Sequence, residues 1–241
     1  MLVGRTPTEL DFAFDGTVED FLDLHPDARR VGKSVHVCLW RGRECMPLRG
    51  NSPENDLMAR DLTINALALD SVGRLYAHPQ ALHDLRRRIL RPASPTSFAC
   101  DPTRIFRLAR FAAAWPDWSI DKNAFEQMRA LSAAELAALP AERVGREILK
   151  ALGAPAPGRF FRVLVQGQAL RPWLAELDQA SRIPAGPAQW HNNSVLGHSL
   201  RIMDMVAGDA VTAWMALCHD LGKIQTDPAL LPHHYGHEKR G

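Results

Sequence analysis

The sequence has few cysteines and no long apolar run, and both features exclude classes of protein. Its four cysteines, Cys38, Cys45, Cys100 and Cys218, lack the CxxC spacing of a zinc site and the density of a disulfide-rich secreted domain. No apolar run reaches the roughly 18 residues of a membrane-spanning helix, and the start lacks the charged and apolar regions of a signal peptide. We therefore expect a cytoplasmic protein with reduced thiols and no membrane contact.

The chain also lacks a strong charge of either sign. Lysine and arginine number 29 against 27 acidic residues, which leaves a net charge of +2. Any affinity for nucleic acid must therefore come from local basic clusters, such as Arg86–Arg88 and the arginines between residues 104 and 110. The 46% hydrophobic content of the 241 residues predicts a globular chain with one large or two modest domains.

The most informative segment is DPTRIFRLARF, in which Arg104, Arg107 and Arg110 recur at every third position. Asp101 can cap a helix and Pro102 suits the first helical position, so a helix is predicted to begin there. At about 100° per residue the three guanidinium groups spread over roughly 120° of one face. Arginine presents a rigid fork of donors that suits phosphate oxygens and base edges. This face is either a solvated basic surface or a nucleotide-binding surface.

A second segment, RDLTINALAL at residues 60–69, gives the first one a context. Together the two segments resemble the patterns RRDxTINAL and DPxRxxRxxRF of the class II tRNA nucleotidyltransferases, the CCA-adding enzymes, and their poly(A) polymerase relatives. Both matches are several residues long and occur in the family's order. Ala59 stands where the first arginine of the family pattern is usual, and Cys100 stands where glutamate precedes Asp-Pro.

This resemblance implies a nucleotide-binding head of the polymerase-β type, in which two carboxylates on a strand hold two magnesium ions. In TELDFAFDG, Glu9 and Asp11 alternate with apolar residues, so both carboxylates are predicted on one strand face, with Asp15 as a weaker candidate. Hard oxygen ligands at such positions suit Mg²⁺. Glu9 replaces the first aspartate of the family's Asp-x-Asp. The alternative is an edge strand with a polar outer face.

The resemblance also implies roles for the arginines. Arg60, Arg107 and Arg110 resemble contacts to the nucleotide phosphates and ribose, while Asp101 and Arg104 resemble the pair that reads the Watson–Crick edge of the incoming base. A carboxylate accepts from the exocyclic amino group that C and A both carry, and an arginine donates to ring nitrogen or carbonyl acceptors. Asp101 could instead serve only as a helix cap.

The chain downstream is predicted to be almost wholly helical. Apolar periodicity marks ALSAAELAAL, ERVGREILKAL and RFFRVLVQGQALRPWLAEL, and residues 153–158 between the last two are predicted to form a loop. Four apolar residues of the second segment are predicted to share one face: Val144, Ile148, Leu149 and Leu152. Glu142, Arg143 and Glu147 match the family's ERxxxE, which we interpret as structural ion pairing.

Histidines gather near the end of the chain, in HNNSVLGHSLRIMD, ALCHDLGK and HHYGHEKRG. This order resembles an HD phosphohydrolase domain of the kind attached to enterobacterial-type CCA-adding enzymes. It implies a divalent transition metal that activates water against a phosphoester. The implied metal ligands are His198, His219 and Asp220, with His237 next. For His191, His233 and His234 we favour ordinary packing or surface roles, and Lys223 is assigned either to phosphate or to a structural role.

We predict an α+β fold with a nucleotidyltransferase head over residues 1–92, a helical nucleotide-reading and neck region over 93–185, and a partial helical HD domain over 186–241. The family's GGxVRD segment precedes the carboxylate pair, whereas this sequence starts with MLVGR, which resembles only the part of the family pattern after that segment. Backbone N–H groups of such a glycine turn supply much of an anion site. We therefore expect the phosphate loop and the last HD aspartate to be missing and nucleotidyl transfer to be impaired.

The predicted function is transfer of CMP and AMP from CTP and ATP to the 3′ end of tRNA, with Mg²⁺ in the head. Poly(A) polymerase activity on RNA 3′ ends shares every motif and is the first alternative. A non-catalytic chain that binds nucleotide or tRNA is the second. An HD phosphohydrolase acting alone is less favoured, because its last ligand is absent. The resemblance implies recognition of tRNA by its acceptor and elbow shape more than by its sequence.

Overall fold

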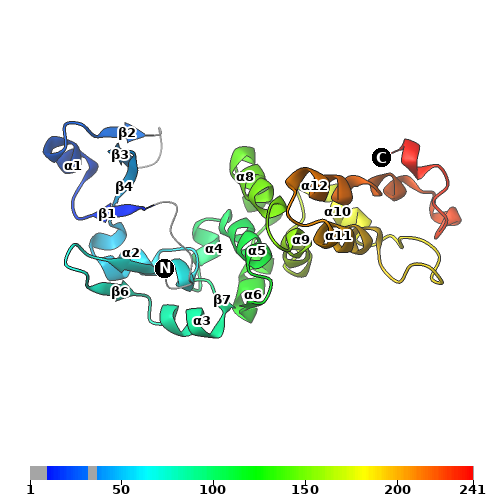
Figure 1. Cartoon of the computed structure of the whole chain (residues 1–241), viewed down its shortest axis with the longest axis horizontal. Helices are drawn as coiled ribbons and strands as arrows, with labels where there is room; N and C mark the ends of the chain where they lie inside the picture. Colours follow the sequence, from blue (N-terminus) through cyan, green and yellow to red (C-terminus); the bar gives the residue numbers. More distant parts are fainter. Residues whose placement is uncertain (1–9, 32–36, 241) are drawn as a thin grey trace. The chain divides into compact units, whose positions relative to one another are not determined.

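A computed structural model of the chain describes residues 10–31 and 37–240, which fall into two units divided between Arg87 and Arg88. The first unit mixes short strands and helices, whereas the second is helical apart from one pair of two-residue strands (Figure 1). The predicted α+β fold class is therefore confirmed. No helix in the described part of the chain is long and apolar enough to cross a membrane.

A four-stranded sheet opens the first unit, with the strand order β1-β4-β3-β2. Its strands are β1 (Phe12–Phe14), β2 (Arg29–Val31), β3 (Val37–Trp40) and β4 (Arg43–Pro47). β1 runs parallel to β4, and the other two pairs are antiparallel. Arg41 and Gly42 connect β3 to β4 with φ angles of 49° and 75°, the left-handed conformation that a tight two-residue hairpin turn requires.

Helix α1 (Val18–Leu24) supplies the core that this sheet needs. The helix begins at a capping box in which Thr17 and Asp20 exchange side-chain and backbone hydrogen bonds. Its buried residues Val18 and Phe21 pack with Cys38 and Cys45 of the sheet. This small apolar cluster therefore holds α1 to β3 and β4.

The segment RDLTINALAL forms a buried turn and then a partly exposed strand in the second half of the first unit. This half contains α2 (Pro53–Met58), two 3-10 helices (Arg49–Asn51 and Thr63–Asn65), the hairpin β5 (Leu67–Leu69) and β6 (Leu75–Ala77), and α3 (Ala81–Arg87). Thr63 donates to Asp84 at 2.7 Å, and Asn65 donates to Asp61 at 3.1 Å. Leu62 is fully buried between these polar contacts. The polar residues of the motif therefore stabilise its turn.

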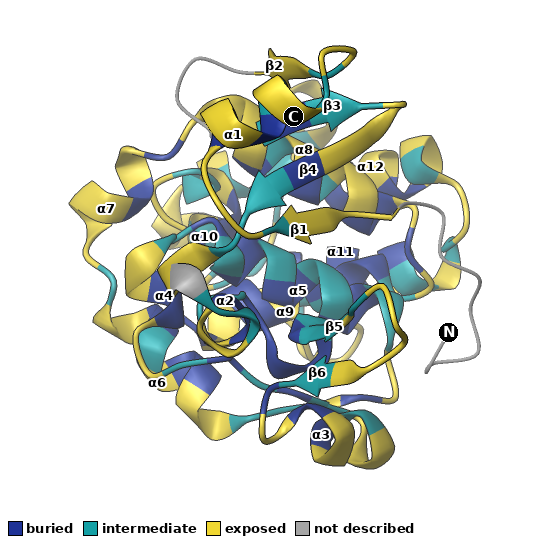
Figure 2. Ribbon diagram, turned by 90° about the vertical axis from the view of Figure 1, so that its left-hand side faces the viewer, coloured by how far each residue is buried: buried dark blue, intermediate teal, exposed yellow. Residues whose placement is uncertain are grey.

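The second unit is built from helices around α5. Its elements are β7 (Ile89–Leu90), α4 (Ser97–Cys100), α5 (Arg104–Ala114), β8 (Ser119–Ile120), α6 (Lys122–Ala130), α7 (Ala133–Ala137), α8 (Ala141–Leu152), α9 (Pro157–Gln166), α10 (Ala175–Ala180), α11 (Val195–Met205), α12 (Ala210–Cys218) and the 3-10 helices Leu221–Gln225, Pro228–Leu230 and His237–Lys239. Ile105, Phe106 and Leu108 of α5 are fully buried, where α5 packs against α8 and α9. Figure 2 shows the ribbon coloured by the burial of each residue, with buried residues in dark blue.

Helices α9 and α11 pack closely, although they lie on opposite sides of the predicted boundary at residue 185. A Cβ atom on Gly158 would lie 2.4 Å from the backbone oxygen of Leu200, so glycine is what allows this approach. The backbone N–H of Gly158 donates to Asp204 at 2.8 Å, and Arg162 pairs with the same carboxylate at 2.6 Å. The packing of these helices thus depends on the absence of a side chain at Gly158 and on the half-buried carboxylate of Asp204.

Several predicted helix boundaries are wrong in detail. α5 begins at Arg104 instead of Pro102, and α9 begins inside the predicted loop at Pro157. The third predicted helix divides, because α9 ends at Gln166 before Gly167 and the chain re-forms a helix only at α10.

One predicted core position is also wrong. Val144 and Leu152 are buried, but Leu149 is 68% exposed. At about 100° per residue, Leu149 lies roughly 140° around α8 from Val144, so one apolar face cannot hold both side chains.

Candidate functional site

Asp101 lies at the turn before α5, and both of its carboxylate oxygens have protein partners. Oδ1 accepts a hydrogen bond from the backbone N–H of Thr103 at 3.1 Å, and Oδ2 accepts one from Arg143 Nη2 on α8 at 2.6 Å. Burial disfavours the charged carboxylate, but the hydrogen bond and charge of Arg143 outweigh it and hold the pKa of Asp101 below its usual value. The group is therefore an ionised acceptor with a fixed orientation.

Arg104 is half-buried at the first position of α5, one turn from Asp101. Its backbone N–H donates to the Asp101 carbonyl at 3.0 Å. Its guanidinium Nη1 donates to the backbone oxygen of Ser97 at 3.2 Å and to the hydroxyl of Ser97 at 3.0 Å. The structure thus brings together, in one turn, the two residues that the family resemblance assigns to base reading.

Arg107 and Arg110 meet a buried glutamate on α8. Arg110 Nε donates to Glu147 Oε2 at 2.5 Å, and Arg107 Nη1 lies 4.0 Å from Glu147 Oε1. The Arg110 guanidinium also lies over the Phe111 ring, 4.2 Å from its centroid. Glu147 therefore offsets part of the positive charge of Arg107 and Arg110 and holds Arg110 in place. The ion pairing predicted for Arg143 and Glu147 is confirmed, whereas Glu142 forms no ion pair with any described residue.

Arg60 is engaged by a buried carboxylate in the first unit. Its Nε and Nη2 donate to Asp56 Oδ2 at 2.9 and 2.7 Å, while Arg49 Nε donates to Asp56 Oδ1 at 2.8 Å. Burial opposes the charge of Asp56, but the hydrogen bonds from the two arginines outweigh it and lower its pKa. Sequence reasoning missed Asp56 and Arg49, although the i, i+4 spacing of Asp56 on α2 and Arg60 just beyond its end was a usable signal.

The predicted strand carboxylates are only partly within the described residues. Glu9 lies outside them, and Asp11 is an exposed residue directly before β1. Within the described ranges, Asp11 forms no ion pair or hydrogen bond with another residue. Its carboxylate is therefore open to solvent and to an ion, and the pairing of Glu9 with Asp11 stays a prediction.

A second cluster joins the start of α11, the end of α12 and the last 3-10 helix. Ligand atoms of His198, His219 and Asp220 all lie within 4.8 Å of one another, close enough for one metal ion. Asp220 Oδ2 lies 3.3 Å from His219 Nε2 and 3.8 Å from His198 Nε2, while its Oδ1 lies 3.3 Å from His237 Nε2. All four residues that the HD resemblance implies therefore converge on the Asp220 carboxylate.

The electrostatics of this cluster centre on Asp220, which is 5% exposed. Lys223 Nζ donates to Asp220 Oδ2 at 2.8 Å and to the backbone oxygen of Ala185 at 2.9 Å. Burial opposes the charge of Asp220, but the Lys223 hydrogen bond and nearby charges lower its pKa. Burial lowers the pKa of His198, which favours the neutral imidazole that a metal requires. The contacts of Lys223 are structural ones.

The remaining histidines take other positions. The His191 ring lies edge-on to His198, with centroids 5.4 Å apart, and Trp190, which precedes it in the sequence, is 77% exposed. His234 Nε2 lies 2.8 Å from the Pro184 oxygen and its Nδ1 lies 2.8 Å from the Thr226 hydroxyl, whereas His233 is exposed beside Tyr235. His234 thus holds the last described segment of the chain against Pro184 and Thr226.

Comparisons with known proteins cover the whole chain. A multifunctional CCA protein of Azoarcus sp. (strain BH72) is 44% identical over all of this sequence, and one of Pasteurella multocida (strain Pm70) is 41% identical. The sequence is similar to these CCA proteins along its whole length. It spans 61% of the length of both relatives. The resemblance stated from the two motifs is confirmed.

Two further comparisons concern one segment of the sequence and the fold. Residues 117–181 match a sequence family described as "Probable RNA and SrmB-binding site of polymerase A". The fold resembles a Bacillus stearothermophilus CCA-adding enzyme in complex with CTP, with a TM-score of 0.60 and 23% identity over 89% of this chain and 61% of that one. It also resembles a Thermotoga maritima CCA-adding enzyme complexed with tRNA, with a TM-score of 0.59 and 19% identity over 95% of this chain and 64% of that one.

Proposed function

We propose that the protein is a template-independent tRNA nucleotidyltransferase that adds CMP and AMP from CTP and ATP to tRNA 3′ ends. The observation that carries this proposal is the turn at the start of α5, where an ionised, oriented Asp101 adjoins the constrained Arg104. The relationship to the CCA proteins and the likeness to CCA-adding folds support it. Poly(A) polymerase activity remains the alternative that shares every motif.

In this proposal the choice of base follows from donors and acceptors. Cytosine and adenine each present an exocyclic amino donor and a ring acceptor at their Watson–Crick edge, whereas uracil and guanine present a carbonyl at the amino position. Ionised Asp101 accepts from the amino group, and Arg104 donates to the ring acceptor. A carbonyl oxygen facing Asp101 would leave two acceptors opposed, which disfavours UTP and GTP.

The remaining roles concern charge. Arg107 and Arg110 carry permanent positive charge on the face of α5 that we assign to phosphate and ribose, and Arg60 has the same assignment in the first unit. Asp11 offers an exposed carboxylate oxygen of the kind that Mg²⁺ prefers, and with Glu9 it would hold the ion. Bound Mg²⁺ would neutralise the triphosphate and favour attack by the terminal ribose hydroxyl.

The test is incorporation of radiolabelled CTP and ATP into a tRNA that lacks its CCA end. We expect the chain to label this tRNA more than its Glu9→Ala, Asp11→Ala double variant does. Long tails made from ATP alone would favour the poly(A) alternative. Equal labelling by the chain and the double variant would reject the transferase and leave a chain that only binds nucleotide or tRNA.

The cluster around Asp220 supports a second proposal, a divalent transition-metal site of the HD type. Its three imidazoles and one carboxylate are a donor set that suits such ions. We expect Mn²⁺ to raise the melting temperature of the chain, because it binds the folded state preferentially. His219→Ala should remove this rise, and the exposed His233→Ala should keep it. A rise of equal size in both variants would contradict the site.

A further inference from the structure

Arg143 lies outside the residues to which the family resemblance assigns nucleotide contact, yet it holds the residue that would choose the base. Its Nη2 lies 2.6 Å from Asp101 Oδ2, and this is its one ion pair within the described part of the chain. A charge-assisted hydrogen bond from a planar guanidinium is stronger and more directional than a neutral one. The contact therefore fixes an orientation of Asp101 as well as its charge.

A second contact makes that orientation unique. The backbone N–H of Thr103 binds Asp101 Oδ1 while Arg143 binds Oδ2, so donors on both oxygens define the plane of the carboxylate. A carboxylate has about four lone-pair sites, so each oxygen keeps the capacity to accept from a base. Without Arg143, rotation of the carboxylate about the Thr103 contact becomes possible. A freely turning acceptor discriminates poorly between a base with an amino group and one without it.

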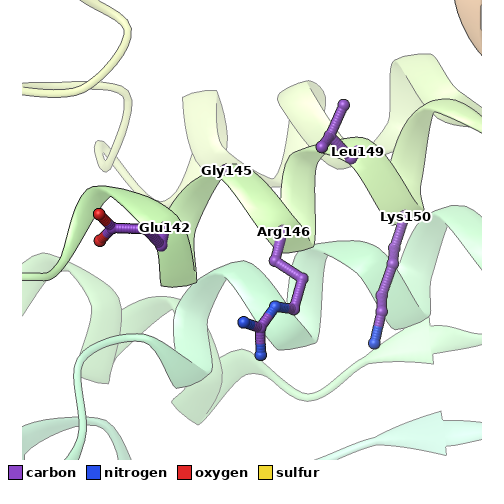
Figure 3. Close-up of a pocket in the computed structure, with 5 residues that line it drawn as sticks. All are labelled: Glu142, Gly145, Arg146, Leu149 and Lys150. Carbon is purple, nitrogen blue, oxygen red and sulfur yellow. The ribbon is translucent and has the colours of Figure 1, made fainter.

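Helix α8 is well placed to provide this support. Arg143 and Glu147 are one turn apart, and both reach residues at or near α5: Arg143 binds Asp101 and Glu147 binds Arg110. A neighbouring strip of α8 differs, since Arg146 forms no ion pair with any described residue and lines an open hollow with Glu142 and Lys150 (Figure 3). Arg143 and Glu147 thus brace the proposed reading turn, and Arg146 offers a matched control.

We infer that Arg143 is a specificity-determining positioning residue, which sets the plane of the Asp101 carboxylate and so the preference for bases with an exocyclic amino group. This inference rests on the proposed function. It predicts that loss of Arg143 affects the ratio of affinities for two nucleotides, whereas a merely structural role would weaken both equally.

The experiment measures binding of CTP and UTP to the full chain and to three variants. We expect the preference for CTP to fall about tenfold in Arg143→Ala, the scale of one good base contact. Arg143→Lys keeps the charge and should recover part of the preference, and Arg146→Ala should match the unaltered chain. An unchanged preference in Arg143→Ala, or an equal loss of affinity for both nucleotides, overturns the inference.

Two further outcomes distinguish failure of this inference from failure of the proposed function. If the unaltered chain binds CTP and UTP alike, the proposed base reading fails and the inference fails with it. If it prefers CTP and Arg143→Ala keeps that preference, the inference alone fails. Carbon-13 NMR of the Asp101 carboxyl needs no nucleotide and applies even where binding is weak: the pKa of Asp101 should rise in Arg143→Ala and stay unchanged in Arg146→Ala. No rise in Arg143→Ala contradicts the contact.

Discussion

At the scale of single residues, buried carboxylates organise the arginines of this chain. Asp56 holds Arg49 and Arg60 in the first unit, and Glu147 holds Arg110 close to Arg107 in the second. A buried carboxylate without its partner is costly, and so is a half-buried guanidinium without its own. These acids therefore position cationic side chains that we assign to phosphate.

We expect Glu147→Ala to lower the free energy of unfolding by about 3 kcal/mol, because it leaves Arg110 partly buried and unpaired. The exposed Glu142, on the same helix, has no ion pair among the described residues, so Glu142→Ala should change stability by less than about 0.5 kcal/mol. Urea unfolding followed by circular dichroism measures both. Equal losses in the two variants would contradict the structural role of Glu147.

Asp56 should make stability depend on pH in the acid range. Its pKa is lowered in the folded state, so its contribution is fully present above its unfolded pKa of about 3.9 and is lost as pH falls through the lower folded value. Asp56→Asn should therefore cost stability at neutral pH and reduce the further loss below about pH 4. Urea midpoints at several pH values, with the exposed Asp23→Asn as control, measure this. Parallel pH profiles for the chain and Asp56→Asn would refute it.

At the scale of elements, helix contacts depend on where glycine permits approach. Gly158 lets α9 meet α11, since an added Cβ would lie 2.4 Å from a backbone oxygen that cannot move as a side chain can. Gly145 sits inside α8 with nothing within 4 Å of an added Cβ. The same substitution should therefore have opposite effects at the two positions.

We expect Gly158→Ala to destabilise the chain by about 1 to 3 kcal/mol through overpacking. Gly145→Ala should instead stabilise it by about 0.5 to 1 kcal/mol, because alanine is the better residue inside a helix. Thermal melting of the two variants beside the unaltered chain gives the comparison. Stabilisation by Gly158→Ala would show that α9 and α11 are not in close contact.

The sequence predicted elements well where local chemistry decides them. The apolar spacing of ERVGREILKAL predicted α8, and the ERxxxE match predicted the ion pairs of Arg143 and Glu147. The sequence did not reveal that the partners would be Asp101 and Arg110, because those contacts join segments about 40 residues apart. The exposure of Leu149 could have been predicted, because the spacing of about 100° per residue places this residue roughly 140° around α8 from Val144.

The histidine cluster also shows that the sequence predicts which residues meet better than it predicts the contacts around them. The motif order predicted that His198, His219, Asp220 and His237 would meet, and the structure places them around one carboxylate. The motif left the role of Lys223 open between phosphate and structure. Its buried contacts with Asp220 and the Ala185 oxygen depend on packing that no spacing rule contains.

At the scale of the whole molecule, the chain comprises two units and spans 61% of the length of its CCA relatives. The proposed base-reading turn lies wholly within the second unit, together with the α8 residues that hold it. Selectivity for the base can therefore be measured as binding, independently of how much nucleotidyl transfer the chain supports.

The most direct test of the account is equilibrium binding of CTP, ATP, UTP and GTP to the full chain and to Asp101→Ala and Arg104→Ala. The account predicts that CTP and ATP bind about tenfold more tightly than UTP and GTP, and that each variant loses this preference. Equal binding of all four nucleotides by the unaltered chain, or an undiminished preference in both variants, would contradict the claim that the start of α5 reads the base.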